Sequence, residues 1–117
     1  MTRNAVLTTL LALGLLAGCA QQTLHQRVDY ICATGGSVSA NYLNLGDGGD
    51  AMVQWQGQLM GMHTVVSGSG ARYDTGPGKG HVWWTKGDEG TLYARDAAGT
   101  ETAVATGCKA TPPLPTE

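Results

Sequence analysis

The side chains of this sequence that could act as nucleophiles or bases are spaced so that they indicate no catalytic centre. Neither Ser67 nor Ser69 has the glycine two positions earlier that a Gly-x-Ser-x-Gly nucleophile turn requires. The three histidines, His25, His63 and His81, lack the i,i+4 pairing and the acidic partner of a zinc site. We therefore predict a protein that is not an enzyme and holds no metal or cofactor. A hydrolase that uses Ser69 with His63 or His81 is the distant alternative.

Two further patterns imitate chemical motifs without completing them. The segment 76–80 has the glycines and the lysine of a phosphate-binding loop, but its first glycine stands at the wrong offset and no Ser or Thr follows Lys79. Asp88 and Glu89 are adjacent carboxylates, which would face opposite sides of a strand. With 7 Lys and Arg against 9 Asp and Glu, the chain has no basic stripe for phosphates, and 117 residues leave little interior for a large cleft. We expect neither nucleic acid nor a small-molecule substrate as a partner.

Cys19 stands at the end of an N-terminal export signal. Arg3 is followed by an apolar run over 5–16, which is shorter than the roughly 20 residues of a membrane-spanning helix. The ending Leu-Ala-Gly-Cys resembles the bacterial lipobox, in which the cysteine becomes the lipidated first residue of the mature protein; an ordinary signal peptide is the alternative. The sequence predicts a signal peptide over 1–18, then a lipidated N-terminus and polar tether over 19–26, anchored in the bilayer by acyl chains. Ala20, where retention in the inner membrane would call for Asp, favours the periplasmic face of the outer membrane.

Cys32 and Cys108 remain once Cys19 is assigned to lipid. In the oxidising compartment that export implies, an even pair of cysteines in a small domain is usually a disulfide. Such a bridge would close a loop of about 76 residues and stabilise the fold by about 4–5 kcal/mol. A metal pair or a reactive thiol is the alternative, although no further His or Cys lies at ligand spacing near either cysteine.

Apolar residues alternate with polar ones along most of the chain after residue 26, which is the pattern of half-buried antiparallel strands. Gly- and Asp-rich turns separate the strands at short intervals, as in a sandwich or a small barrel. A closed barrel leaves no open edge, and with eight strands its side chains fill the interior, so we expect function on the rim loops. We predict an all-β antiparallel barrel domain over 27–109 and a disordered tail over 110–117, with strands at 28–32, 37–42, 53–56, 58–67, 70–74, 81–86, 91–95 and 100–107.

Two segments stand out from this generic pattern. Ser67–Tyr73 reads Ser-Gly-Ser-Gly-Ala-Arg-Tyr, and Trp83–Glu89 reads Trp-Trp-Thr-Lys-Gly-Asp-Glu. On composition alone they are a flexible hairpin loop and a turn with a solvated lysine. Together they resemble the membrane-bound and periplasmic inhibitors of c-type lysozyme, the MliC/PliC family. That family carries Ser-Gly-x-Gly-x-x-Tyr and Trp-x-Lys-Gly-x-x-Ala between an early Tyr-x-Cys and a late Cys, which Tyr30–Cys32 and Cys108 match, so the resemblance covers roughly residues 28–108.

The resemblance implies an eight-stranded antiparallel barrel with a conserved loop that enters the active-site groove of a c-type lysozyme. One serine and one lysine of the motifs face the catalytic carboxylates, and Ser69 and Lys86 stand at the matching positions. Gly68 and Gly70 are expected to take positive φ so that the backbone can approach closely. Trp84 is expected to brace the loop, and Trp83 to brace it or contact the target. The residues carried over as lysozyme-binding are Ser67, Gly68, Ser69, Gly70, Arg72, Tyr73, Trp84 and Lys86.

This sequence departs from the family pattern at two places. Gly90 stands where the family usually has Ala, a change that we expect to be harmless. The stretch between Tyr73 and Trp84 is a few residues longer, which would alter how deeply the loop reaches. The alternative to a lysozyme inhibitor is a non-enzymatic envelope lipoprotein barrel that binds a small ligand or scaffolds an envelope complex.

Overall fold

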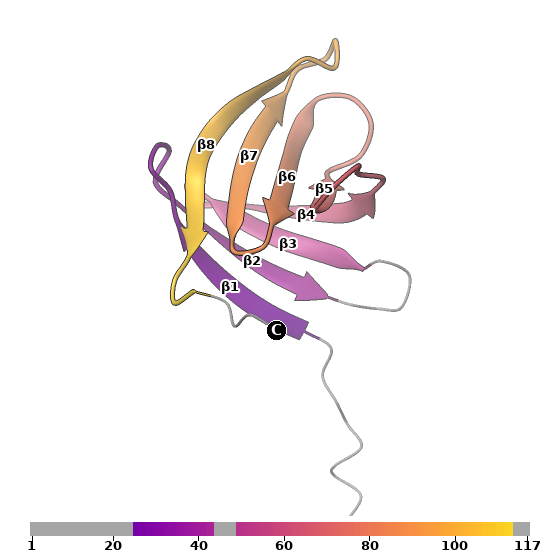
Figure 1. Ribbon diagram of the computed structural model, residues 1–117. Coiled ribbons are helices and arrows are strands. Elements are labelled where there is room, and N and C mark those ends of the chain that lie inside the picture. The colour runs from indigo at the N-terminus through magenta and orange to yellow at the C-terminus, as the bar shows by residue number, and fades with distance from the viewer. Residues whose placement is uncertain (1–24, 44–48, 114–117) are drawn as a thin grey trace, which may run out of the picture.

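A closed antiparallel barrel makes up the computed structural model of the protein, which describes residues 25–43 and 49–113 (Figure 1). Each strand pairs with the next in chain order, and the last strand returns to pair with the first. The predicted barrel of eight strands is confirmed, and the strand ends differ from the predicted ones by at most three residues. The strands are β1 (His25–Ile31), β2 (Ser37–Leu43), β3 (Asp50–Trp55), β4 (Gln58–Val65), β5 (Ala71–Asp74), β6 (Gly80–Lys86), β7 (Glu89–Arg95) and β8 (Glu101–Ala110).

The predicted flanking segments lie mostly outside the described residues, Cys19 among them. His25 and Gln26, which the sequence predicts as part of the tether, already belong to β1. Ala110, assigned to the tail, is the buried last residue of β8, and the backbone N–H of Thr111 donates to the carbonyl oxygen of Asp29 at 2.8 Å. Among the described residues no helix is long and apolar enough to cross a membrane.

Side chains fill the interior of the barrel. Buried residues alternate with more exposed ones along β1, β2, β3, β4 and β7, as the sequence pattern predicts, and in the described part of the chain no polar or charged residue is fully buried. The largest side chains with almost no exposure come from six different strands: Trp83, Tyr30, Met62, Leu92, Val38 and Val53.

A small hydrogen-bonded cluster of aromatic side chains fixes one part of this core. The hydroxyl groups of Tyr30 and Tyr42 lie 2.7 Å apart, and Trp83 Nε1 donates to the Tyr42 hydroxyl at 2.8 Å. The ring of Tyr30 also meets the Trp83 indole edge-on, with centroids 5.0 Å apart. Burial raises the pKa of both tyrosines, because a phenolate would lose its hydration there. The inward position of Trp83 is therefore held by directional bonds as well as by packing.

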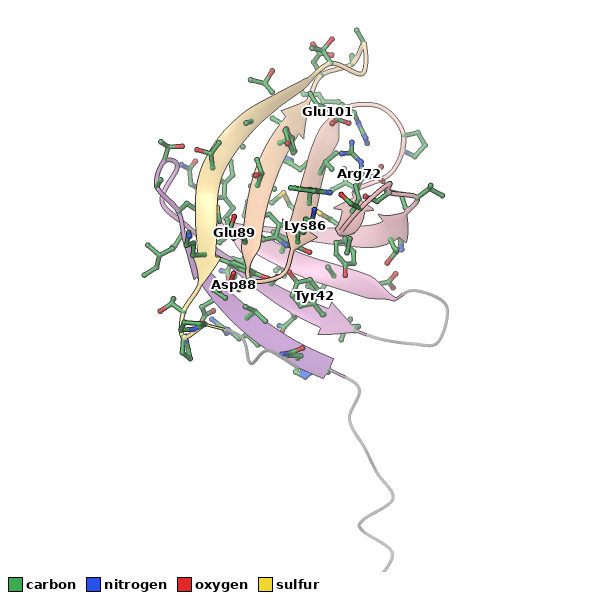
Figure 2. All side chains as sticks on the ribbon, in the orientation of Figure 1. Tyr42, Arg72, Lys86, Asp88, Glu89 and Glu101 are labelled. Carbon is green, nitrogen blue, oxygen red and sulfur yellow. A yellow bond between two sulfur atoms is a disulfide. The ribbon has the colours of Figure 1, made fainter. Side chains whose placement is uncertain are left out.

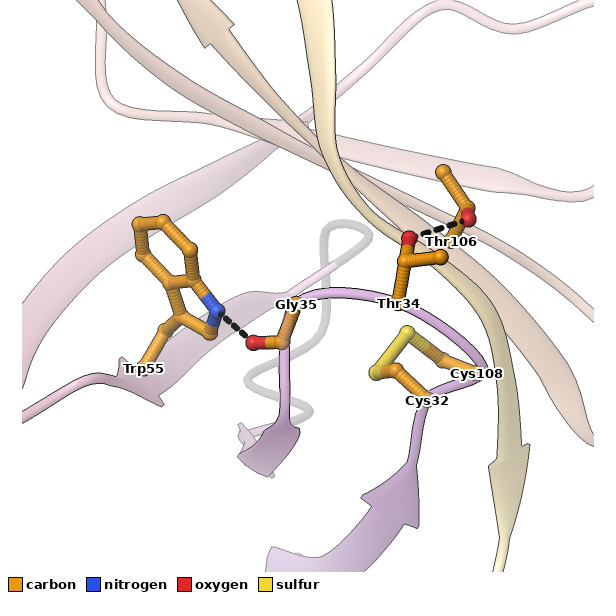
Figure 3. Close-up of a disulfide and its surroundings, with 6 residues drawn as sticks. All are labelled: Cys32, Thr34, Gly35, Trp55, Thr106 and Cys108. Atoms are coloured by element: carbon orange, nitrogen blue, oxygen red, sulfur yellow. Dashed lines mark hydrogen bonds between the residues drawn. A yellow bond between two sulfur atoms is a disulfide. The ribbon is translucent and has the colours of Figure 1, made fainter.

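The disulfide between Cys32 and Cys108 closes the seam between β1 and β8, as predicted (Figure 3). This seam has the shortest ladder of the barrel, with only Tyr30 opposite Ala110 and Ile31 opposite Lys109. Beyond the ladder, the hydroxyl groups of Thr34 and Thr106 lie 2.6 Å apart. A covalent link thus joins the two strands where the backbone pairing is shortest.

Strand direction decides which loops share an end of the barrel. β4 and β6 run in the same direction, so the β4–β5 loop (66–70) and the β6–β7 turn (87–88) emerge at one end, which we call the motif end (Figure 1). The β5–β6 loop (75–79) and the β7–β8 loop (96–100) emerge at the other end.

Candidate functional site

The pairing of β5 with β6 brings the two sequence motifs together at the motif end. Ala71 lies opposite Thr85, so Gly70, the last residue of the β4–β5 loop, comes beside Lys86, the last residue of β6. A Cβ atom on Gly70 would lie 3.3 Å from the Cβ of Lys86 and would collide with the carbonyl oxygen of Thr85. Gly70 also has a φ of 68°, which favours glycine. The close approach of the serine-rich loop to Lys86 therefore depends on a residue without a side chain.

Hydrogen bonds to one carbonyl oxygen hold the loop in place. Trp84 Nε1 donates to the carbonyl oxygen of Ser69 at 3.0 Å, and the Ser67 hydroxyl donates to the same oxygen at 2.6 Å. Trp84 faces the outside of the barrel, since its neighbour Trp83 faces the core, and its indole reaches the loop from the next strand. The Ser69 hydroxyl itself bonds to no described residue and is exposed, so the loop is fixed while this hydroxyl stays available.

Lys86 supplies an exposed cation beside the loop that carries this hydroxyl. Its ammonium group forms no ion pair with any described residue. Glu89 lies directly opposite Lys86 across the two-residue β6–β7 turn, but its carboxylate pairs with Lys109 at 3.4 Å. Figure 2 shows Lys86, Asp88 and Glu89 where β6 turns into β7. An unpaired ammonium at the edge of a loop with an available hydroxyl is suited to bind a carboxylate through charge-assisted hydrogen bonds.

Among the other predicted site residues, Gly68 differs from expectation in its backbone conformation, while Tyr73 and Arg72 lie on β5. Gly70 has a positive φ but Gly68 does not, so only one of the two glycines needs its conformational freedom. Tyr73 faces the core, where its ring lies 5.6 Å from that of Tyr42 and burial raises its pKa. Arg72 faces outward and pairs with Glu101, with Nη2 2.6 Å from Oε2, away from Lys86 in Figure 2.

The longer stretch between the motifs lies at the opposite end of the barrel. The Arg95 side chain holds this β5–β6 loop through two hydrogen bonds. Its Nε donates to the carbonyl oxygen of Gly78 at 2.8 Å, and its Nη2 donates to the carbonyl oxygen of Gly76. The same guanidinium pairs with Asp74 at 3.3 Å, and the Arg95 side chain is only 12% exposed. The additional residues therefore lie away from Ser69 and Lys86, where they do not lengthen the β4–β5 loop.

Gly90 lies on the inner face, against the indole of Trp83. A Cβ atom at this position would come within 2.6 Å of the Trp83 ring atom Cη2. The glycine therefore gives the indole space that an alanine would take. An alanine at position 90, the usual residue of the family, would therefore require the Trp83 indole to shift. The sequence alone does not show this contact.

One exposed residue of the motif end was missed from the sequence. Val66 is 95% exposed and directly precedes the serine-rich loop. The predicted fourth strand extends to residue 67, and alternation along it would place Val66 on the inner face with Met60 and Met62. The strand ends at Val65 instead, which releases Val66 to solvent. The signal would have been the glycines and serines that follow at once, because they favour a loop.

The described histidines form no catalytic arrangement with Ser69. The Nδ1 atom of His63 lies 2.8 Å from Oδ1 of Asp50, and His81 lies beside the Trp55 ring, where burial lowers its pKa. No hydrogen bond links either ring to Ser69 in the described part of the chain. Within residues 25–43 and 49–113, no group of three His, Cys, Asp or Glu could hold a metal ion.

Comparison with known proteins shows which family the sequence of this chain matches. The sequence model of the family described as membrane-bound lysozyme-inhibitor of c-type lysozyme matches residues 30–101. Proteins named membrane-bound lysozyme inhibitor of C-type lysozyme are similar to this chain. The one from Pseudomonas aeruginosa is 40% identical over 83 residues, which is 70% of this chain and 62% of that protein. The one from Cupriavidus necator is 39% identical over 85 residues, 73% of this chain and 66% of that protein. The match thus spans slightly less than two thirds of either relative.

Proposed function

Because this chain belongs to the family of membrane-bound lysozyme inhibitors of c-type lysozyme, we propose that it inhibits such a lysozyme by inserting the β4–β5 loop and Lys86 into the active-site groove. The inhibitor would protect the peptidoglycan of the cell that carries it. The observation on which this proposal depends is the unpaired Lys86 ammonium beside the braced Ser69 loop.

The chemistry of the target explains why an ammonium group inhibits it. A retaining glycosidase of the lysozyme type uses two carboxyl groups about 5 Å apart, one protonated as the general acid and the other ionised. A cation between them stabilises the ionised form of both and lowers the pKa of the acid, which then has no proton to give to the leaving group. Lys86 supplies this cation, and the Ser69 hydroxyl donates a further hydrogen bond to a carboxylate oxygen.

Two features of the free protein favour tight binding. Lys86 breaks no ion pair with a described residue when it enters the groove, and the loop is already held by Trp84 and Ser67 through the carbonyl oxygen of Ser69. A loop fixed in its bound shape loses less conformational entropy on binding. In this proposal Ser67, Gly68, Ser69, Gly70 and Lys86 meet the lysozyme, while Arg72, Tyr73 and Trp84 support the strands and the loop from behind.

We propose that the barrel works on a lipid anchor at Cys19, on the periplasmic face of the outer membrane. The lipobox and the following Ala20 support this location, and the similar proteins are named membrane-bound lysozyme inhibitors. Cys19 precedes the first residue of β1, His25, by six positions, and an extended chain reaches about 3.5 Å per residue. The barrel would therefore stay within about 20 Å of the lipid surface.

Clearing of a cell-wall suspension by a c-type lysozyme tests the proposal. The purified protein should stop the clearing, and Lys86→Met should weaken inhibition by about 2 kcal/mol or more, because the target's acidic groups lose their partner. Lys79→Met is the matched control, since it removes an equal charge from the exposed loop at the opposite end of the barrel. Unchanged clearing with micromolar protein would refute the proposed function, and full inhibition by Lys86→Met would refute the role of the lysine.

A further inference from the structure

Three charged side chains form a row across the outside of β6, β7 and β8 at the motif end. Lys86 lies opposite Glu89, and Glu89 lies opposite Lys109. Their neighbours Gly90 and Cys108 face the core, so Glu89 and Lys109 face outward with Lys86. Directly opposite residues on adjacent strands have Cβ atoms about 5 Å apart. Glu89 therefore has a lysine on each side, and its carboxylate pairs with only one of them.

The structure resolves this choice in favour of Lys109. The Glu89 carboxylate lies 3.4 Å from the Lys109 ammonium, whereas it makes no ion pair with Lys86. The backbone supports this arrangement, because the N–H of Ala110 donates to the carbonyl oxygen of Asp88 at 2.8 Å and so ties the β6–β7 turn to the end of β8. Lys109, the residue before Ala110, is thereby kept beside Glu89.

We propose that Lys109 is a positioning residue that acts on Lys86 through Glu89. By holding the Glu89 carboxylate on the β8 side, it keeps the Lys86 ammonium unpaired and ready for the carboxylates of the target. Without Lys109, Glu89 turns to Lys86, and the target must then compete with a carboxylate of the inhibitor itself. This inference rests on the proposed function, since it concerns how strongly Lys86 binds a lysozyme.

Removal of the Lys109 ammonium should weaken lysozyme inhibition, and the expected loss is small. Both partners of the pair are largely exposed, with side chains 67% and 61% accessible, so a competing pair of the same kind changes affinity about two- to five-fold. Lys109→Met should raise the inhibition constant by this factor in low salt. The loss should disappear in about 0.5 M salt, which screens exposed pairs, and Lys109→Arg should restore wild-type inhibition.

A double-mutant cycle in the full-length protein separates this indirect role from a direct contact. Glu89→Gln should inhibit at least as well as wild type, and adding Lys109→Met to Glu89→Gln should cause no further loss, because no competing carboxylate remains. Lys79→Met controls for the change of net charge. An equal loss from Lys109→Met in both backgrounds would overturn the inference in favour of a direct contact, and no loss in either would also overturn it. A wild-type protein that fails to inhibit would instead refute the proposed function itself.

Discussion

The contact between Gly70 and the end of β6 makes a sharp prediction for two glycines of the same loop. Gly70→Ala should destabilise the barrel, because alanine at a φ of 68° costs about 1–2 kcal/mol and its Cβ collides with the carbonyl oxygen of Thr85. Relief of such overpacking costs a further 1–3 kcal/mol or so. We therefore expect a total loss of about 2–5 kcal/mol. Gly68→Ala should change stability by less than about 0.5 kcal/mol, since Gly68 has open space around its missing Cβ and no positive φ.

Urea denaturation followed by tryptophan fluorescence, with the disulfide intact, measures this difference. With an m value of about 1–1.5 kcal/mol/M for a domain of this size, a loss of about 3 kcal/mol lowers the midpoint by roughly 2–3 M. Gly70→Ala should also weaken lysozyme inhibition in conditions where it is still folded, because relief of the collision moves Ser69 away from Trp84 and Lys86. Midpoints of Gly70→Ala and Gly68→Ala that agree within about 0.3 M would refute the contact between the loop and β6.

Three further predictions concern the disulfide, the loop brace and the core. Replacing Cys32 and Cys108 together by Ala should lower the free energy of unfolding by about 4.5 kcal/mol, as loop entropy for a separation of 76 residues gives, and guanidinium denaturation checks this. Trp84→Phe should cost about 1 kcal/mol of stability and several-fold in inhibition, measured by denaturation and wall clearing, because it removes the indole N–H that holds Ser69. Burial raises the pKa of Tyr42, so the folded state keeps this proton at a pH where the unfolded chain loses it. Stability should therefore be independent of this group below pH ~10 and fall above it, by up to about 1.4 kcal/mol per pH unit, and Tyr42→Phe should flatten that fall in denaturation curves at pH 9–11.

The strands could be predicted from the sequence because the barrel buries one face of each strand. Alternation marks inward residues such as Val28, Tyr30 and Val53 without any knowledge of their partners. Alternation did not predict the strand ends, because pairing with the neighbouring strand decides where each strand begins and ends. His25 belongs to β1 because it lies opposite Leu43, and Glu89 begins β7 because it closes the two-residue turn from Lys86.

The site was predictable in its location and only partly in its contacts. The two motifs flank consecutive antiparallel strands, so their meeting at one end follows from local topology. The pairing of Arg72 with Glu101 does not, because β6 and β7 lie between their strands and β7 meets β8 with shifts in register. The position of Gly90 against Trp83 is equally hidden, since only the packed core shows that the indole fills the space of a missing methyl group.

Proton release on binding tests most directly whether Lys86 inhibits by entering between two carboxyl groups. The general acid of a lysozyme has a pKa of about 6, so at pH 5 it is about 90% protonated before binding. If the ammonium forces both groups to ionise, calorimetric titrations in buffers of different ionisation enthalpy should show release of about 0.9 proton per complex, and Lys86→Met should abolish that release. Tight binding without proton release, or the same release with Lys86→Met, would contradict the account.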